Sequence, residues 1–274
     1  MKILQANGAN IPALGFGTWT LAGEQCSELV SKALAAGYHH IDTAAMYDNE
    51  QAVGLGLNGS EVPREQIFLT SKVWPTEIAE GDLQRSVEAS LKRLDTPYLD
   101  LALIHWPSAT VPLAQSIKAL NDIKARGLAQ NIGVSNFTNA MIDEAVALSD
   151  HPIACNQVEN HPYLDQSKMR DTCARHGLAL IAYCPLSRGG ELFSEPSVIA
   201  AAEKYAKTPA QIVLRWHMEF GDAGAIPKTA TPSRLKENLD IFDFQLSPEE
   251  CAAISGLVGR NHRICDFEFS PKWD

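Results

Sequence analysis

The sequence predicts an α/β protein: a single (β/α)8 barrel domain over residues 1–274, with an N-terminal hairpin and an irregular C-terminal tail. Strand-like and helix-like stretches alternate eight times, in units of roughly 25–32 residues, without a linker or low-complexity break. Eight such units in about 250 residues are typical of this barrel. A doubly wound open sheet shows the same alternation and is the structural alternative. The barrel is favoured because every expected strand ends in polar or Gly-Thr residues, which a barrel gathers on one face.

Strands are expected where short apolar runs meet turn residues. Residues 2–13 form a hairpin with its turn at 7–10, ahead of the barrel. The barrel strands are expected at 14–17, 38–41, 67–72, 99–104, 129–134, 153–158, 178–183 and 223–226. The polar groups at their ends are Gly17-Thr18, Asp42, Lys72, His105, Ser135-Asn136, Gln157, Tyr183 and Lys228.

Each expected strand is followed by apolar residues at helical spacing, and Gly37 follows the first helix as a C-cap glycine would. The helices are expected at 25–36, 49–57, 81–94, 111–125, 139–148, 166–176, 209–219 and 232–239. The longest insertion, 184–208, contains a helical patch at 197–205. A further helix at 247–256 begins with Ser-Pro-Glu-Glu, an N-cap signal, and the tail 257–274 is aromatic and irregular.

Composition predicts a cytoplasmic globular protein. Hydrophobic residues make up 45% and charged residues 20% of the chain, and the net charge of −10 argues against nucleic acid or an anionic membrane as partner. The six cysteines show no C-x-x-C spacing, so we expect them to be reduced and mostly buried. No signal peptide is expected at Met1-Lys2, and no apolar run reaches the length of a membrane span.

Four polar residues after successive strands predict a catalytic constellation: Asp42, Tyr47, Lys72 and His105. A carboxylate buried at a strand end is costly unless a cation meets it, and Lys72 ends the neighbouring strand. A lysine held beside a tyrosine favours the phenolate and lowers a phenol pKa whose usual value is about 10. Tyr47 is therefore expected to donate a proton near neutral pH.

Simpler interpretations of these patterns are less favoured. Asp42, Lys72 and Tyr47 could be a structural ion pair with a packing tyrosine, but His105 also ends a strand. His39 and His40 could suggest a metal centre, yet they alternate across a strand and too few ligands converge, so no metal is expected. The segment 54–59 matches G-x-G-x-x-G, but it closes a helix instead of opening one, so helix-end glycines are the better account.

A second group of residues predicts a site for a phosphorylated, amide-bearing cofactor. Lys228 ends a strand, hydroxyl residues follow, and Arg234 lies in the first turns of the next helix, which together suit an anion. A capped, solvated helix start is the simpler alternative. Ser135, Asn136 and Gln157 offer hydrogen bonds to a carboxamide, and Tyr183 offers a flat face for stacking.

The chain resembles the aldo-keto reductases over essentially its whole length, and is most similar to the small bacterial 2,5-diketo-D-gluconic acid reductases. The segments that carry the resemblance are 15–19 (GFGTW), 41–44 (IDTA) with Tyr47, 70–74 (TSKVW), 103–107 (LIHWP), 133–137 (GVSNF), 156–163 and 226–229 (IPKT). The resemblance implies that Tyr47 is the general acid, that Lys72 lowers its pKa, that Asp42 pairs with Lys72, and that His105 orients the carbonyl.

The resemblance also implies that NADPH lies across the barrel mouth. The cofactor residues it implies are Gly17, Thr18, Trp19, Ser135, Asn136, Gln157, Tyr183, Pro185, Leu186, Ile226, Lys228, Thr229, Thr231, Arg234, Glu237 and Asn238. The substrate pocket would be walled by Trp19, Trp74, Trp106 and Phe267. Cys184 stands where the family commonly has Ser, and Thr231 where a second Arg often helps to bind the phosphate.

The implied activity is NADPH-dependent reduction of small polar carbonyls, such as keto-sugar acids (2,5-diketo-D-gluconate) or methylglyoxal-like α-oxoaldehydes, by a monomer. The short segment 106–111 after the fourth strand favours an open pocket of this kind. The alternative is a regulatory barrel that binds NADPH without turnover, against which the complete set of four catalytic residues speaks. A metal-dependent hydrolase on the same fold is a more distant alternative.

Overall fold

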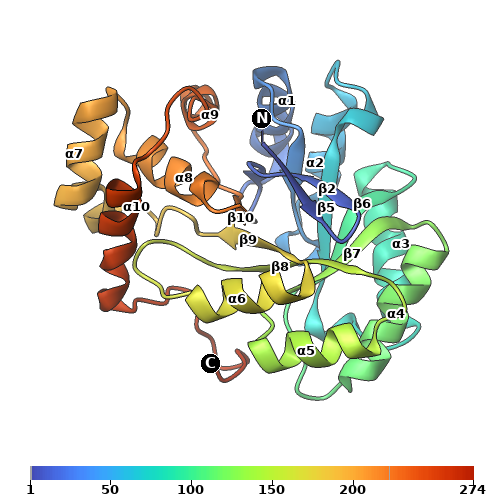
Figure 1. Cartoon of the computed structure of the whole chain (residues 1–274). Coiled ribbons are helices and arrows are strands. Elements are labelled where there is room, and N and C mark those ends of the chain that lie inside the picture. Colours follow the sequence, from blue (N-terminus) through green and yellow to red (C-terminus); the bar gives the residue numbers. More distant parts are fainter. Residues whose placement is uncertain (1, 222) are drawn as a thin grey trace.

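The computed structural model describes residues 2–221 and 223–274, and its centre is a sheet of eight parallel strands (Figure 1). The strands lie in the order β10-β9-β8-β7-β6-β5-β4-β3. They are β3 (Phe16–Gly17), β4 (His40–Asp42), β5 (Phe68–Val73), β6 (Leu99–Ile104), β7 (Ala129–Ser135), β8 (Ile153–Glu159), β9 (Ala179–Tyr183) and β10 (Ala223–Ala225).

The sheet closes on itself between its first and last strands. The Gly15 N–H donates to the Ala225 carbonyl at 2.9 Å, and the Ala225 N–H donates to the Ala13 carbonyl at 2.7 Å. Leu14 and Ala225 form the parallel bridge between these edges. An open sheet has two unpaired edges, so this closure selects the barrel over the doubly wound alternative.

Helices follow the strands and surround the barrel. They are α1 (Gly23–Ala36), α2 (Glu50–Asn58), α3 (Asp82–Leu94), α4 (Leu113–Ala125), α5 (Asn139–Leu148), α6 (Ser167–His176), α7 (Pro196–Tyr205), α8 (Pro209–Glu219), α9 (Pro232–Leu239) and α10 (Pro248–Ser255). Gly37 ends α1 with a φ of 107°, and Ser247 caps α10 with its side chain, both as expected. No helix among the described residues is both long and apolar enough to cross a bilayer.

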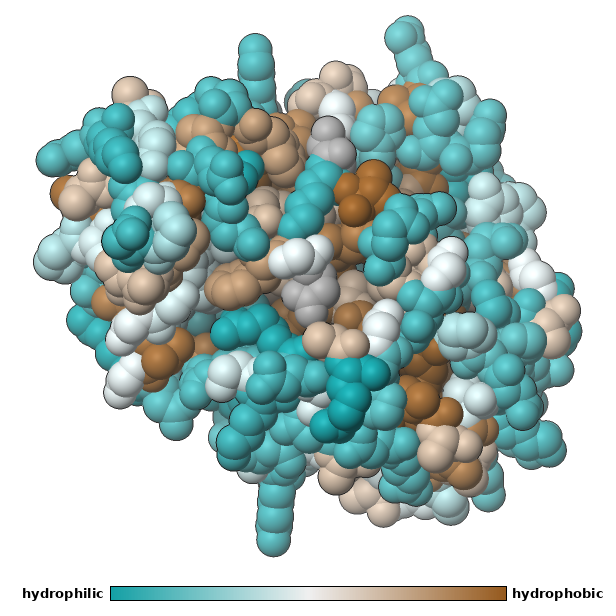
Figure 2. Space-filling view, in the orientation of Figure 1, coloured by the Kyte–Doolittle hydropathy of each residue, from teal (hydrophilic) through white to brown (hydrophobic). Residues whose placement is uncertain are grey.

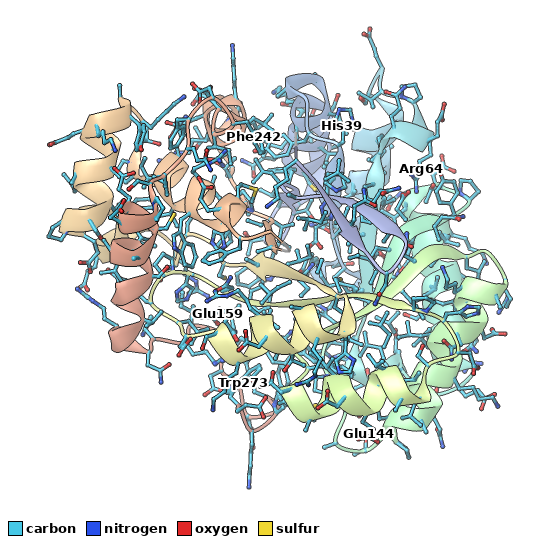
Figure 3. All side chains as sticks on the ribbon, in the orientation of Figure 1. His39, Arg64, Glu144, Glu159, Phe242 and Trp273 are labelled. Atoms are coloured by element: carbon cyan, nitrogen blue, oxygen red, sulfur yellow. The ribbon has the colours of Figure 1, made fainter. Side chains whose placement is uncertain are left out.

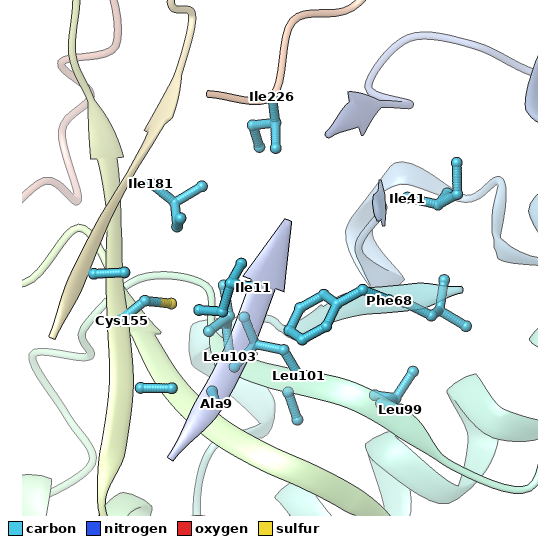
Figure 4. Close-up of a cluster of buried hydrophobic side chains, with 14 of the residues drawn as sticks. Ala9, Ile11, Ile41, Phe68, Leu99, Leu101, Leu103, Cys155, Ile181 and Ile226 are labelled. Atoms are coloured by element: carbon cyan, nitrogen blue, oxygen red, sulfur yellow. The ribbon is translucent and has the colours of Figure 1, made fainter. Parts of the chain in front are cut away.

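Strands β1 (Ile3–Ala6) and β2 (Ala9–Pro12) form the expected antiparallel hairpin. Figure 4 shows Ile11 from this hairpin beside Leu101 and Leu103, with Phe68, the first residue of β5, close by. The hairpin therefore covers the end of the barrel where the strands begin, and leaves the end with the polar residues open. On the face shown in Figure 2, hydrophilic side chains cover most of the helices, with smaller apolar areas between them.

Several details differ from the sequence-based expectations. The first barrel strand was expected at 14–17 but covers only Phe16–Gly17, and Leu14 pairs with Ala225 as an isolated bridge ahead of it. Gly54 and Gly56 lie inside α2, not only at its end, and a Cβ there would come within 2.6 Å of the Leu94 and Ser27 carbonyl oxygens. These glycines let α2 pack closely against its neighbours. Because they lie within a helix, they do not form a phosphate-binding loop. The tail is not wholly irregular, since it begins with a 3₁₀ turn, Gly256–Arg260.

Candidate active site

The four predicted catalytic residues meet at the open end of the barrel. Asp42 ends β4, Tyr47 lies in a single 3₁₀ turn (Ala45–Tyr47), Lys72 is in β5 and His105 directly follows β6. The Lys72 Nζ lies 2.5 Å from the Asp42 Oδ1 and 3.3 Å from the Tyr47 hydroxyl, and it also donates to the Thr43 carbonyl at 2.9 Å. The ammonium thus links the carboxylate to the phenol.

Lys72 is held in its charged form although it is fully buried. Burial alone would lower the pKa of the ammonium, but Asp42 and Tyr47 raise it, and the net shift is upward. Asp42 is fixed in turn, because its Oδ2 accepts a hydrogen bond of 2.8 Å from the Gln157 amide. Both charges of this buried ion pair therefore have additional hydrogen-bond partners, which offset the cost of removing them from water.

The pKa of Tyr47 corrects one expectation. Burial raises this pKa and is the largest effect, while the nearby Lys72 lowers it, and the net shift is upward from 10.0. The expected net lowering is therefore wrong for this structure: Lys72 acts in the expected direction, but desolvation of the phenol outweighs it. Tyr47 keeps its proton at neutral pH, and Lys72 reduces the cost of giving it up.

His105 faces the same cavity as a neutral imidazole. Burial and the Lys72 charge together hold the pKa of His105 well below its usual value. Its ring meets the edges of Tyr47, at a centroid distance of 5.6 Å, and Trp74, at 5.3 Å. A neutral imidazole can donate one hydrogen bond to a carbonyl oxygen without competing for the proton of Tyr47.

Two buried residues that the sequence analysis missed fix the turn that carries Tyr47. The Asn49 side chain donates to the carbonyls of Thr18 and Leu21 at 2.9 Å and accepts from the Thr43 hydroxyl. The Glu50 carboxylate accepts from the Ser71 hydroxyl at 2.5 Å and pairs with Arg93. Their signal was the polar run 48–50 at the start of a helix that is otherwise apolar on its inner face.

A cavity of about 640 Å³ opens above these residues. It is lined by most of the residues named from the sequence: Gly17, Trp19, Asp42, Tyr47, Trp74, His105, Trp106, Asn136, Gln157, Tyr183, Pro185, Leu186, Ile226, Lys228, Arg234 and Phe267. The lining residues that were missed are Thr20, Met46, Cys184, Arg188, Gly189, Phe193, Pro227, Cys265 and Phe269. Most of these lie on the 184–208 insertion and on the tail, whose paths a strand–helix pattern does not define.

The amide and hydroxyl residues on the cavity floor bind one another. The Asn136 amide donates to the His105 carbonyl at 2.9 Å, and its Oδ1 accepts from the Tyr183 hydroxyl at 2.6 Å. The Ser135 hydroxyl donates to the Gln157 carbonyl at 2.7 Å and lies behind the cavity wall. Asn136 and Gln157 each keep oxygen capacity for a ligand amide.

Lys228 and Arg234 form a cationic rim on one side of the cavity. Both are exposed, and within residues 2–221 and 223–274 neither makes an ion pair. In an acidic protein, two such cations beside a cavity suit an anionic ligand group. Thr229 and Glu237, which were also predicted to bind the cofactor, have hydrogen-bond partners within the protein. Thr229 accepts from the Thr231 N–H at 3.0 Å, and Glu237 accepts from the Thr208 hydroxyl at 2.9 Å.

The structure does not place every predicted residue on the cavity wall. Those that lie outside the lining are Thr18, Lys72, Ser135, Thr229, Thr231, Glu237 and Asn238. The Thr18 hydroxyl donates to the Asp42 carbonyl at 3.0 Å, and Lys72 lies behind Asp42 and Tyr47. Both therefore support the site from below. Thr231 is the residue before α9 and Asn238 is buried within it.

Aromatic side chains wall the opposite side of the cavity. Trp106 packs edge to face against Phe267 and Phe269, with ring centroids 5.9 and 5.3 Å apart. The ring centroids of Trp74 and Phe269 are 5.6 Å apart. Trp19 is 45% exposed and lines the cavity from the loop after β3. Aromatic lining with a few polar atoms is typical of a small-molecule pocket, in which the polar atoms fix the orientation of the ligand.

The histidine pair that suggested a metal centre has ordinary partners. The His40 ring nitrogens lie 3.2 Å from the Pro12 carbonyl and 3.0 Å from the Thr70 hydroxyl, and the His39 Nδ1 lies 3.0 Å from the Gln66 carbonyl. Among the residues that the structure describes, no group of three His, Cys, Asp or Glu side chains could hold a metal ion. His40 is a hydrogen-bonded core histidine.

Comparison with known proteins identifies the family to which this barrel belongs. The aldo/keto reductase family model matches residues 13–258. An aldo-keto reductase from Mycolicibacterium smegmatis is 39% identical over 260 residues, which is 93% of each chain. Human aldo-keto reductase family 1 member A1 is 37% identical, over 93% of this chain and 88% of its own. A crystal structure assigned to a 2,5-diketo-D-gluconic acid reductase B superposes with a TM-score of 0.97 at 43% identity, covering 100% and 98% of the two chains.

The matched residues span the barrel and include Asp42, Tyr47, Lys72 and His105, the four residues predicted to be catalytic. Members of the matching family are oxidoreductases that depend on a nicotinamide cofactor and reduce carbonyl groups. The chain belongs to the aldo/keto reductase family and is an NAD(P)H-dependent oxidoreductase.

Proposed function

We propose that this protein reduces small polar aldehydes and ketones to alcohols with NADPH, through Asp42, Tyr47, Lys72 and His105. The observation that carries the proposal is the Asp42–Lys72–Tyr47 chain of hydrogen bonds, which ends at a phenol in the cavity beside a neutral histidine. 2,5-Diketo-D-gluconate and methylglyoxal-like α-oxoaldehydes are the substrates we favour. The first is also the substrate in the name of the similar crystal structure.

The residues divide the chemistry between them. A reduced nicotinamide bound in the cavity would supply the hydride for the carbonyl carbon. Tyr47 donates its proton to the carbonyl oxygen, and the Lys72 ammonium stabilises the phenolate that remains. Asp42 keeps Lys72 charged and in place, and His105 hydrogen-bonds the carbonyl oxygen. A proton held by Tyr47 at this oxygen would keep negative charge from building up there during the reduction.

The donor set fits NADPH. The oxygens of Asn136 and Gln157 would hold the carboxamide, and Tyr183 would lie against the ring. Lys228 and Arg234 would take the 2′-phosphate, because they are exposed at the cavity rim and unpaired within the described chain. Thr229, Thr231, Glu237 and Asn238 would act around this phosphate and the adenine mainly by shaping the start of α9.

Removing the cationic rim tests the preference for NADPH. Each charge-assisted hydrogen bond to a phosphate contributes about 1.5–3 kcal/mol, so Lys228→Ala or Arg234→Ala should raise the KM for NADPH about 10- to 100-fold. The KM for NADH should change little, because NADH lacks the phosphate. Lys236→Ala is the matched control, since Lys236 is exposed on the same helix but does not line the cavity. Equal effects on both cofactors would contradict the assignment.

A substrate panel followed by NADPH absorbance tests the reaction itself. We expect measurable reduction of glyoxal-type dicarbonyls and keto-sugar acids, with kcat/KM well above that for steroid or long-chain carbonyls, because the pocket is open and ringed by aromatic and polar groups. A strong preference for the large carbonyls would contradict the substrate class. No turnover with any carbonyl would favour the alternative, a regulatory barrel that binds NADPH. The relatives described above, which are named as reductases, give that alternative no support.

A further inference from the structure

The C-terminal tail, residues 261–274, supplies the aromatic wall of the cavity, formed by Phe267 and Phe269. The tail contains no helix or strand that would hold these side chains in place. The rings of Phe267 and Phe269 stack with their centroids 5.3 Å apart, and both contact Trp106 on the cavity side. Their exposed fractions are 48% and 49%, so about half of each residue remains in contact with solvent and packing holds it only in part. Their position must therefore depend on how the tail backbone is attached to the barrel.

Glu159 provides an attachment from inside the barrel. It is the last residue of β8, two residues after Gln157, and it is completely buried. Its Oε1 accepts a hydrogen bond of 2.6 Å from the Ile264 N–H, and its Oε2 accepts one of 2.7 Å from the Cys265 N–H. Figure 3 shows Glu159 above the segment that carries Trp273. One carboxylate thus binds two consecutive tail amides.

The charge state of Glu159 suits this attachment. Burial alone would raise the pKa of the carboxyl, but hydrogen bonds from His161 and from the two tail amides outweigh it, and the net shift is downward. The His161 Nε2 lies 2.9 Å from the Glu159 Oε1, and this ring is also completely buried. A buried carboxylate is costly unless donors satisfy it, and two of the three donors that satisfy Glu159 are amides of the tail.

The other end of the tail has a weaker attachment. The Asp274 carboxylate accepts from the N–H and the side-chain amide of Asn139 at 2.5 and 2.7 Å, but these contacts are exposed to solvent. Water competes with exposed hydrogen bonds, so they hold the backbone less firmly than buried ones. The aromatic wall lies between this exposed contact and the buried one at Glu159.

We propose that Glu159 is a positioning residue for substrate binding: its carboxylate holds the tail amides of Ile264 and Cys265 and so keeps Phe267 and Phe269 against the pocket. The proposal rests on the proposed carbonyl reduction for its kinetic consequence. Glu159 does not itself line the cavity, and its hydrogen bonds go to the tail and to neighbouring residues of its own segment. Its effect should therefore appear in substrate binding and not in the chemical step.

Glu159→Gln tests this, because the amide keeps one acceptor and turns the other into a donor that faces an N–H. Hydrogen exchange followed by mass spectrometry on the native protein should show amides 264 and 265 exchanging at least about tenfold faster, since a charge-assisted hydrogen bond is lost. The KM for a small dicarbonyl should rise about tenfold or more, with kcat changed less than about threefold. The Kd for NADPH should stay within about twofold.

Asn139→Ala is the matched control, because it removes the side-chain donor of the exposed attachment, leaves the backbone N–H, and should change KM less than about threefold. Phe267→Ala with Phe269→Ala should raise KM in the wild type but add little to Glu159→Gln, if both act through the same wall. Faster tail exchange with an unchanged KM, or a raised KM with unchanged exchange, would overturn the proposal. If Glu159→Gln does not fold, Glu159→Asp shortens the attachment by one methylene, and the same outcomes decide.

The exchange measurement separates the two proposals. If no carbonyl is reduced, the proposed function fails, whereas faster exchange at 264 and 265 would still identify Glu159 as the tail attachment. The quenching of tryptophan fluorescence by a dicarbonyl would then replace KM as the measure of binding. Unchanged exchange in both Glu159 variants would contradict the attachment whatever the activity.

Discussion

Tyr47→Phe is expected to lower kcat/KM for carbonyl reduction by about two to four orders of magnitude, because general acid catalysis contributes about that much. The variant removes only the hydroxyl, which lies 3.3 Å from the Lys72 Nζ, and keeps the ring that packs against His105. The fold and the Kd for NADPH should therefore stay close to those of the wild type. Most of the loss should appear in kcat, since the proton is transferred only in the transition state.

Tyr205→Phe is the matched control for this loss. Its hydroxyl donates to the Glu250 carboxylate at 2.8 Å, outside the cavity, so the change removes one tyrosine hydroxyl and one hydrogen bond without touching the site. Its kcat/KM should remain within about twofold of the wild type. Carbonyl reduction that continued undiminished in folded Tyr47→Phe would refute the assignment of the proton donor.

The barrel could be predicted because the signals for its strands and helices lie in short stretches of sequence. Each strand–helix unit repeats the same apolar pattern, and each helix end carries its own signal, such as Gly37 or Ser247. The closure between Leu14 and Ala225 could not be read directly, because it joins residues far apart in the sequence. The roles of Gly54 and Gly56 were missed for the same reason: the carbonyls they approach belong to other helices.

The site residues at the strand ends were predictable from the strand–helix pattern. Those on the 184–208 insertion and the C-terminal tail were not. Asp42, Lys72 and His105 end neighbouring strands, and the barrel brings such ends together. Arg188 and Phe269 lie on the insertion and the tail, where no periodic pattern places them. The net pKa shift of Tyr47 also escaped prediction, because it depends on how completely the folded chain buries the phenol, and sequence spacing names only its neighbours.

The second large effect is expected for Lys72→Met, which should lower both stability and activity. Asp42 and Lys72 are both 1% exposed, so the change leaves a buried carboxylate with only the Gln157 amide as donor from a side chain. Breaking a buried ion pair in this way costs about 3–5 kcal/mol of unfolding free energy, measurable by urea denaturation. The phenolate of Tyr47 also loses its cation, so kcat should fall about 100- to 1,000-fold.

A second substitution separates these two losses. In the double variant Lys72→Met with Asp42→Asn neither partner is charged, and the oxygen of the introduced amide can still accept the hydrogen bond from Gln157. The double variant should therefore regain most of the lost stability, because replacing a buried ion pair by neutral residues is often close to neutral. Its kcat should stay low, because nothing stabilises the phenolate of Tyr47 when the proton leaves. If kcat returned together with stability, Lys72 would be a structural residue and the proton transfer would need another source of stabilisation.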